Sequence, residues 1–142
     1  MHSFLLFLIL SINIFADNYV KAQNTVFDIN RNLIWQDNPE VLHNPATFSG
    51  AKIYCRSLFL NGFSDWRVPT IKELQTIVDI TKAKPAIYEQ FKYIETTSYW
   101  SSNEDITNPG YGWYVGFKTG ATYKDNKDYD CYVRCVRTRF KK

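Results

Sequence analysis

Histidine is almost missing from this chain of 142 residues: there are two, and only His43 lies beyond the first few positions. A histidine that acts as a catalytic base works together with partner residues, and a metal site built from several imidazoles needs more than one histidine. Glycine and proline are sparse as well, with six and five residues, and charged residues make up only 22%. The composition therefore argues against His-based catalysis, multi-His metal sites, and a disordered or low-complexity chain.

The excess of positive charge is also small: the chain has 17 basic and 14 acidic side chains, which gives a net charge of +3. A protein that neutralises many phosphates along a nucleic acid needs a denser basic surface. We therefore expect no nucleic-acid partner, and any polyanion would have to bind a local patch. What the chain has in plenty is aromatic residues, at 17%, which suits one domain with an ordinary core.

The first 16 residues contain no Asp, Glu, Lys or Arg. Their apolar stretch, residues 4–15, is shorter than the roughly 20 residues of a membrane span and fits the core of a secretory signal peptide. Cleavage after Ala16 is the favoured prediction and cleavage after Ala22 the alternative; a tethering N-terminal helix stays open because residues 1–3 lack Lys and Arg. We expect a single domain over 17–142, without a membrane span after signal removal, that is periplasmic, on the cell surface or secreted.

Two β-hairpins are indicated by β-prone runs around turn-forming residues. Residues 25–27 and 33–35 flank a segment rich in Asp and Asn, and residues 113–117 and 121–123 flank Thr119-Gly120. The last segment, 132–140, is also β-prone.

Two helices lie between these hairpins. Ala51, Cys55 and Leu58 recur at helical spacing and predict a helix over 47–58. Thr70 and Glu73 form a capping box that opens a second helix, predicted to run to about Ile80. Residues 81–105 are irregular, and Pro85, Ile87 and Phe91 are expected to hold this excursion on the core. The pattern predicts an α+β fold, in which two short helices pack on one side of antiparallel strands.

Five blocks in a fixed order carry a family resemblance: residues 33–37, 51–58, 61–74, 99–102 with 113–117, and 133–137. The most specific block reads Ser64-Asp65-Trp66-Arg67-Val68-Pro69-Thr70, followed by Glu73-Leu74. In this order the blocks resemble the Legionella collagen-like protein C-terminal (Lcl C-terminal) domain family. The resemblance implies a C-type-lectin-like domain of bacterial envelope and secreted proteins, with its N- and C-terminal strands close together. The namesake is an adhesin whose domain is associated with trimers and sulfated glycosaminoglycans, so a trimer and an anionic polysaccharide partner are implied.

Most motif residues are expected to be structural. Tryptophans in a small aromatic-rich domain usually belong to the core, although a stacking platform for sugars is the alternative. Arg67 is expected to hydrogen-bond local carbonyls or to pair with Asp65 or Glu73, rather than to bind an anion. The residues assigned this structural role are Trp66, Arg67, Pro69, Thr70, Glu73 and Trp100. Asp125, Asp128 and Asp130 are interpreted as a solvated turn rather than a calcium site, and no metal or cofactor is expected.

Three cysteines behind a secretory signal predict at least one disulfide. Within the blocks shared with the family, Cys55 is expected to pair with Cys135, and Cys55 with Cys131 is the alternative. A bond between Cys131 and Cys135 would need a turn, because an extended strand holds their Cα atoms about 13 Å apart. The related formylglycine-generating oxidases use a close pair of cysteines, which Cys131 and Cys135 resemble. An oxidase is nevertheless the less favoured interpretation, because a structural disulfide explains Cys135 better.

Basic residues accumulate toward the C-terminus, where 124–142 hold seven basic and three acidic side chains. Alternate residues of an extended strand project from one face about 6.6 Å apart, a repeat that can follow sulfate groups. The predicted polyanion-binding residues are Lys124, Lys127, Arg137, Arg139, Lys141 and Lys142. The sequence thus predicts a non-enzymatic, adhesin-like domain that binds anionic polysaccharide; the alternatives are a solvated tail without a ligand and a structural or protein-interaction module.

Overall fold

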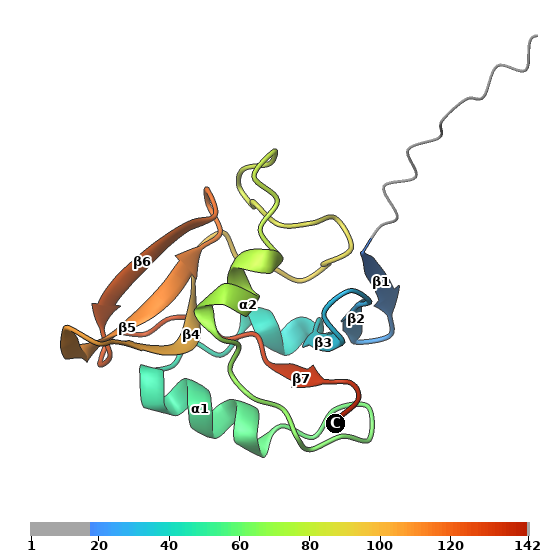
Figure 1. Cartoon of the computed structure of the whole chain (residues 1–142), viewed down its shortest axis with the longest axis horizontal. Coiled ribbons are helices and arrows are strands. Elements are labelled where there is room, and N and C mark those ends of the chain that lie inside the picture. The colour runs from blue at the N-terminus through green and yellow to red at the C-terminus, as the bar shows by residue number, and fades with distance from the viewer. Residues whose placement is uncertain (1–17, 142) are drawn as a thin grey trace, which may run out of the picture.

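The first sheet takes strands from both ends of the chain (Figure 1). In the computed structural model, which describes residues 18–141, β1 (Tyr19–Ala22), β2 (Thr25–Asp28) and β3 (Leu33–Gln36) form consecutive antiparallel pairs. β7 (Val136–Thr138) pairs antiparallel with β3 and completes the order β1-β2-β3-β7. The first predicted hairpin and the closeness of the N- and C-terminal strands are thereby confirmed, whereas β1 was not predicted.

A second antiparallel sheet is formed by β4 (Ser98–Asp105), β5 (Asn108–Gly116) and β6 (Ala121–Asn126), in that order. The hairpin predicted around Thr119-Gly120 is the β5–β6 pair. Gly120 adopts a φ of +83°, which a residue without a Cβ tolerates easily. β4 lies within residues 81–105, which the sequence predicted to be irregular.

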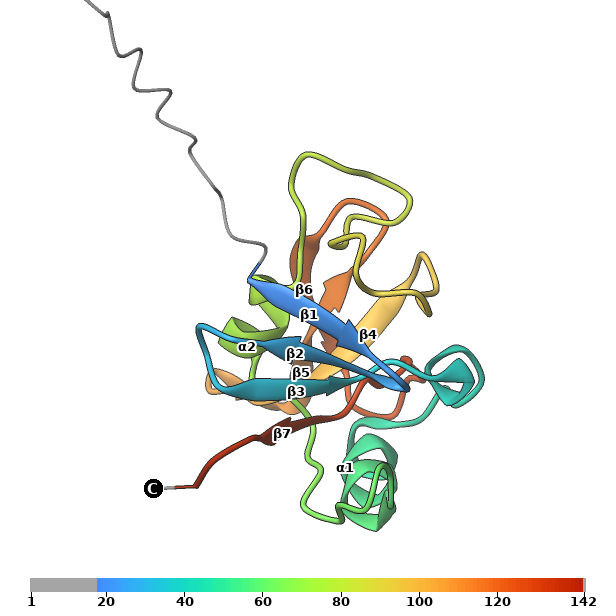
Figure 2. The same cartoon turned by 90° about the vertical axis from the view of Figure 1, so that its right-hand side faces the viewer.

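The first helix, α1 (Phe48–Ser57), agrees with the prediction to within one residue at each end. Thr47 caps it by accepting a hydrogen bond from the Gly50 backbone N–H at 3.1 Å. Ala51, Cys55 and Leu58 are all buried, as their spacing indicated. α1 lies along the lower side of the molecule in both views (Figure 1, Figure 2).

The second helix, α2 (Ile71–Thr76), has the predicted capping box but is shorter than expected. It ends because the following backbone pairs with a later segment: Val78 forms a β-bridge with Ile87, and the Asp79 N–H donates to the Ala86 carbonyl at 3.2 Å. The predicted extension to Ile80 is wrong, and Ile80 is 90% exposed. A short 3-10 helix (Pro39–Leu42) precedes α1.

The core has two clusters of buried side chains: one joins the two sheets and α2, and the other lies under α1. Trp35, Trp66 and Trp100 are at most 3% exposed, so the prediction that tryptophans are core residues is confirmed for these three. Cys55 and Cys135 form the predicted disulfide, which ties α1 to the segment that enters β7. The alternative pairing of Cys55 with Cys131 is therefore wrong.

The predicted signal peptide, residues 1–16, and Lys142 lie outside the described residues. Within 18–141, none of the helices combines the length and the apolar character that crossing a membrane requires.

Candidate anion-binding site

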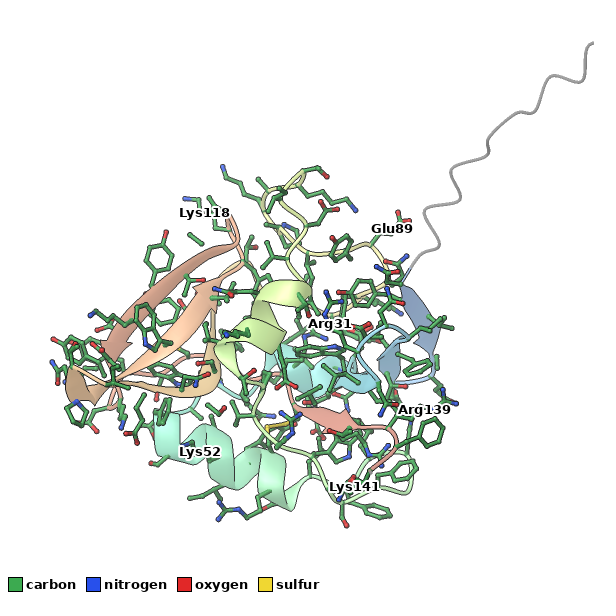
Figure 3. The ribbon with its side chains drawn as sticks, viewed as in Figure 1. Arg31, Lys52, Glu89, Lys118, Arg139 and Lys141 are labelled. Carbon is green, nitrogen blue, oxygen red and sulfur yellow. A yellow bond between two sulfur atoms is a disulfide. The ribbon has the colours of Figure 1, made fainter. Side chains whose placement is uncertain are left out.

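A pocket of about 460 Å³ opens between α1, the segment 66–70 and β4. We call it the α1 pocket. Lys52 and Arg56 line it from α1, Ser102 from β4, and Trp66, Arg67, Val68 and Thr70 from the segment between them. Figure 3 labels Lys52 on α1. Three of the seven lining residues are basic and none is acidic.

The segment 66–70 is held rigidly by the elements around it. The Arg67 N–H donates to the Val136 carbonyl at 2.9 Å, and the Val136 N–H donates back at 2.8 Å, so Arg67 pairs with β7. The Ser102 N–H donates to the Pro69 carbonyl at 2.8 Å. Trp66 and Val68 are buried, and the Trp66 indole N–H donates to the Phe63 carbonyl at 3.0 Å. The pocket floor is therefore formed by a fixed backbone with apolar side chains beneath it.

Arg67 forms the ion pair with Glu73 that the sequence suggested. Its two terminal nitrogens donate to the two carboxylate oxygens at 2.6 and 2.8 Å. Burial raises the pKa of Glu73, but hydrogen bonds from Arg67 and from the Thr70 backbone outweigh it and hold that pKa below its usual value. The same carboxylate completes the capping box of α2 through the Thr70 N–H at 2.8 Å. The Arg67 guanidinium is thereby fixed in position at the pocket wall.

Lys52 and Arg56 are cations of a different kind, because they are not paired. They stand four residues apart on α1 and therefore share one helix face. Within the part of the chain that the structure describes, no carboxylate forms an ion pair with either of them; the nearby acids Glu73 and Glu104 pair with Arg67 and Lys127. The Lys52 ammonium lies 4.5 Å from the centre of the Phe48 ring. Both charges remain available to a ligand.

Two hydroxyl groups add to this set of donors. The Thr70 oxygen accepts the Glu73 backbone N–H at 3.1 Å, which leaves its own proton free to donate. The Ser102 hydroxyl has no hydrogen-bond partner among residues 18–141. The pocket thus presents an ammonium, a guanidinium and two hydroxyls, and no open carboxylate.

The structure divides the predicted polyanion-binding residues between two places. Lys124 lies on β6 and forms an ion pair with Asp105 at 2.8 Å, and Lys127 follows β6 and pairs with Glu104 at 2.9 Å. Hydrogen bonds from these lysines lower the pKa of both carboxyl groups. Their charges are therefore neutralised locally. Lys127 also lies 5.0 Å from the Phe48 ring, which places it beside Lys52.

Arg137 does not project into solvent as predicted, and this expectation is corrected. It is 5% exposed, its Nε donates to Asp65 at 2.6 Å, and its guanidinium lies 3.7 Å from the centre of the Phe63 ring. The hydrogen bond from Arg137 holds the pKa of Asp65 below its usual value. Arg134, also counted in the basic stretch, is fully buried. The charge count therefore overstated the exposed patch.

Of the remaining members of the predicted patch, Arg139 and Lys141 are exposed, and Lys142 lies outside the described residues. The Arg139 guanidinium lies between two aromatic rings, 4.3 Å from the centre of Phe27 and 4.7 Å from that of Phe140. Lys141 lies 3.3 Å from the Asp65 carboxylate that Arg137 already engages, and its side chain is 72% exposed. Figure 3 shows Arg139 and Lys141 near the C-terminal end. We call these two residues the C-terminal cations.

Cys131 and Cys135 do not form the pair of free thiols that a formylglycine-generating oxidase would need. Cys135 is bonded to Cys55, and Cys131 is buried. Burial raises the pKa of the Cys131 thiol to about 12, so the thiol is protonated at neutral pH. Across residues 18–141, no three His, Cys, Asp or Glu side chains gather closely enough to hold a metal ion.

Sequence reasoning missed Lys52, Arg56 and Ser102 as pocket residues. The spacing of Lys52 and Arg56 on the predicted helix was a usable signal, because it puts two cations on one face with no acid within the helix. Nothing in the local sequence indicated that Ser102 meets them, since that contact depends on the docking of β4 against the segment 66–70.

The family model described as the Lcl C-terminal domain matches residues 24–137, which covers most of the chain. The chain matches no curated protein.

Proposed function

Because the chain belongs to the Lcl C-terminal domain family, we propose that it is an exported, non-catalytic binding domain of C-type-lectin-like fold. Its proposed ligand is a sulfated or otherwise anionic polysaccharide. The observation that carries the proposal is a group of exposed or half-exposed cations on one side of the molecule: Lys52 and Arg56 on α1, and the C-terminal cations, of which Lys141 also pairs with Asp65.

α1 and the C-terminal end lie on the lower side in both views, whereas the β5–β6 turn with Lys118 lies at the top (Figure 1, Figure 2, Figure 3). A polyanion that touches this side meets the exposed Arg56 and Arg139 and the half-exposed Lys52. A flexible polymer with repeated charges can contact several such groups at once, and the weak contacts then reinforce one another.

The contacts would be exposed to solvent, so they depend on salt. Charges at a protein surface are screened over about 8 Å at physiological ionic strength. Several weak ion pairs should therefore drive binding, and all of them should weaken as the salt concentration rises. The protein should accordingly bind an anionic column at low salt and elute at higher salt.

Neutralising the C-terminal cations together with the adjacent Lys142 should weaken the retention of the protein on a heparin column. We expect the triple variant Arg139→Gln, Lys141→Gln, Lys142→Gln to elute from a heparin column at clearly lower salt than the parent. Two charges are lost from the proposed binding side, and a third is lost from the next residue of the chain. Its melting temperature should change little, since Arg139 and Lys141 are exposed. Arg137 is left in place because its removal would leave Asp65 without its main partner.

A matched control removes the same charge elsewhere. Lys21, Lys84 and Lys118 are exposed and lie on β1, in the segment after α2 and at the β5–β6 turn. Changing these three to Gln should leave the elution salt close to that of the parent. Equal elution of the test and control variants would refute binding through the C-terminal cations.

Export is part of the proposal, and β1 bears on where the signal peptide ends. Cleavage after Ala22 would remove β1, whose Tyr19 is 6% exposed and donates its hydroxyl to the Thr76 carbonyl at 2.6 Å. Cleavage after Ala16 keeps this strand and its pairing with β2. The intact mass of the exported protein should correspond to residues 17–142, and a mass that starts at residue 23 would contradict this.

A protein-interaction module is the second candidate, and exposed apolar side chains favour it. Phe59 is 72% exposed, Phe140 64%, Ile53 61% and Phe63 44%. Large apolar groups in solvent often mark interaction surfaces. Unchanged heparin retention in the triple variant would favour this second candidate.

A further inference from the structure

We infer that the α1 pocket binds a single acidic pyranose unit, meaning one sugar ring that carries one carboxylate or sulfate group. The inference rests on the proposed function and goes beyond it, because it assigns a defined site to one sugar residue rather than a diffuse surface to a polymer.

The pocket has the size of a small-molecule site. Its volume of about 460 Å³ falls within the range of roughly 300–1,000 Å³ that is usual for such sites. Its walls come from α1, from the segment 66–70 and from β4, and the last two are joined by the backbone hydrogen bond from the Ser102 N–H to the Pro69 carbonyl. A ligand would therefore enter a site that is largely formed in advance, which reduces the entropy lost on binding.

The chemistry of the walls selects an anion. Lys52, Arg56 and the two hydroxyls can all donate. Both nearby carboxylates are engaged: Glu73 by Arg67 and the Thr70 N–H, and Glu104 by Lys127. A cationic ligand would meet repulsion here. A carboxylate or sulfate would form charge-assisted hydrogen bonds, which are shorter and stronger than neutral ones, and the planar Arg56 guanidinium can bind two oxygens at once.

The remaining donors and the floor suit a sugar ring. The hydroxyls of Thr70 and Ser102 can exchange hydrogen bonds with ring hydroxyls, which both donate and accept. Val68 and the aliphatic stems of Lys52 and Arg56 offer apolar contact to the C–H groups of the ring. Trp66 is only 3% exposed and therefore contributes an edge to the floor rather than an open face for stacking.

Arg67 has a positioning role in this site. Its guanidinium is held by Glu73, and its backbone pairs with β7. It therefore shapes one wall of the pocket, while its charge is balanced by Glu73 and the net positive charge comes from Lys52 and Arg56.

The test is an NMR titration of the mature domain with glucuronate, glucose 6-sulfate, glucose and inorganic sulfate in separate experiments. We expect at least one acidic sugar to bind with saturable shifts of the amide signals of Lys52, Arg56 and Ser102, and to bind at least about tenfold more tightly than glucose or sulfate. The inference is overturned if neither acidic sugar binds, or if glucose or sulfate alone binds equally well.

Variants distinguish binding in the α1 pocket from binding elsewhere on the protein surface. Lys52→Gln with Arg56→Gln should weaken binding of the acidic sugar at least tenfold, and Ser102→Leu should weaken it by filling the pocket without changing charge. Lys118→Gln, on the opposite side (Figure 3), should bind like the parent. If both pocket variants bind like the parent, the inference is wrong. The proposed function would still stand if the C-terminal triple variant lost heparin retention, so the two failures are distinguishable.

Discussion

Replacing Cys55 and Cys135 together by alanine is expected to lower the free energy of unfolding by about 4 to 5 kcal/mol in the chain-entropy description of disulfides. The bond joins residues 80 positions apart, so it removes much of the freedom of the unfolded chain. Domains of this size are stable by only about 5–15 kcal/mol. The variant should therefore be close to unfolding at physiological temperature.

Urea denaturation of the parent and the double variant measures this loss. Cys131→Ala is the matched control, because Cys131 is buried in the same cluster but is not bonded. It should cost only about 1 kcal/mol, as is usual for a small truncation. If the double variant lost no more stability than this control, the disulfide would not constrain the chain as described.

The second large effect is expected at Arg134, which is fully buried and forms an ion pair with Asp37 at 3.0 Å. Its guanidinium also donates to the carbonyls of Gln36, at 2.6 Å, and Tyr93. Asp37 in turn accepts the backbone N–H groups of Lys92 and Tyr93 at 2.9 and 3.1 Å. The pair therefore ties the excursion between α2 and β4 to the end of β3.

Arg134→Met should cost about 3 to 5 kcal/mol, because removing one partner leaves a buried charge without compensation. Asp37→Leu should cost a similar amount, and the double variant should cost clearly less than the sum of the two. Urea unfolding of all three variants measures the coupling. Additive losses would show that the two side chains do not act as a pair.

Much of the architecture could be predicted from local patterns. The two hairpins follow from β-prone runs around Asn, Asp and Gly turns, and α1 follows from the spacing of Ala51, Cys55 and Leu58. The end of α2 could not be predicted in this way, because the helical pattern continues to Ile80 while the backbone is drawn into pairing with residues 86 and 87. Long-range pairing here overrides local periodicity.

The candidate site was harder to predict, because charge counts do not show which charges are buried. Arg134 and Arg137 stand in a β-prone segment that reads as a basic strand, yet both find a carboxylate, Asp37 and Asp65, far away in the sequence. Conversely, Lys52 and Arg56 belong to no chemical motif, and only their helical spacing marks them in the sequence. Which cations stay open depends on partners that only the fold brings together.

The central claim is that the side bearing α1 and the C-terminal cations binds anionic polysaccharide. It is tested most directly by mapping the amide signals of the mature domain during titration with a sulfated heparin oligosaccharide. We expect the shifted signals to belong to α1 and to residues 137–141 and to return to their original positions as salt is added, while the signals of the β5–β6 turn around Lys118 stay unchanged. An absence of shifts at low salt, or shifts centred on that turn, would contradict it.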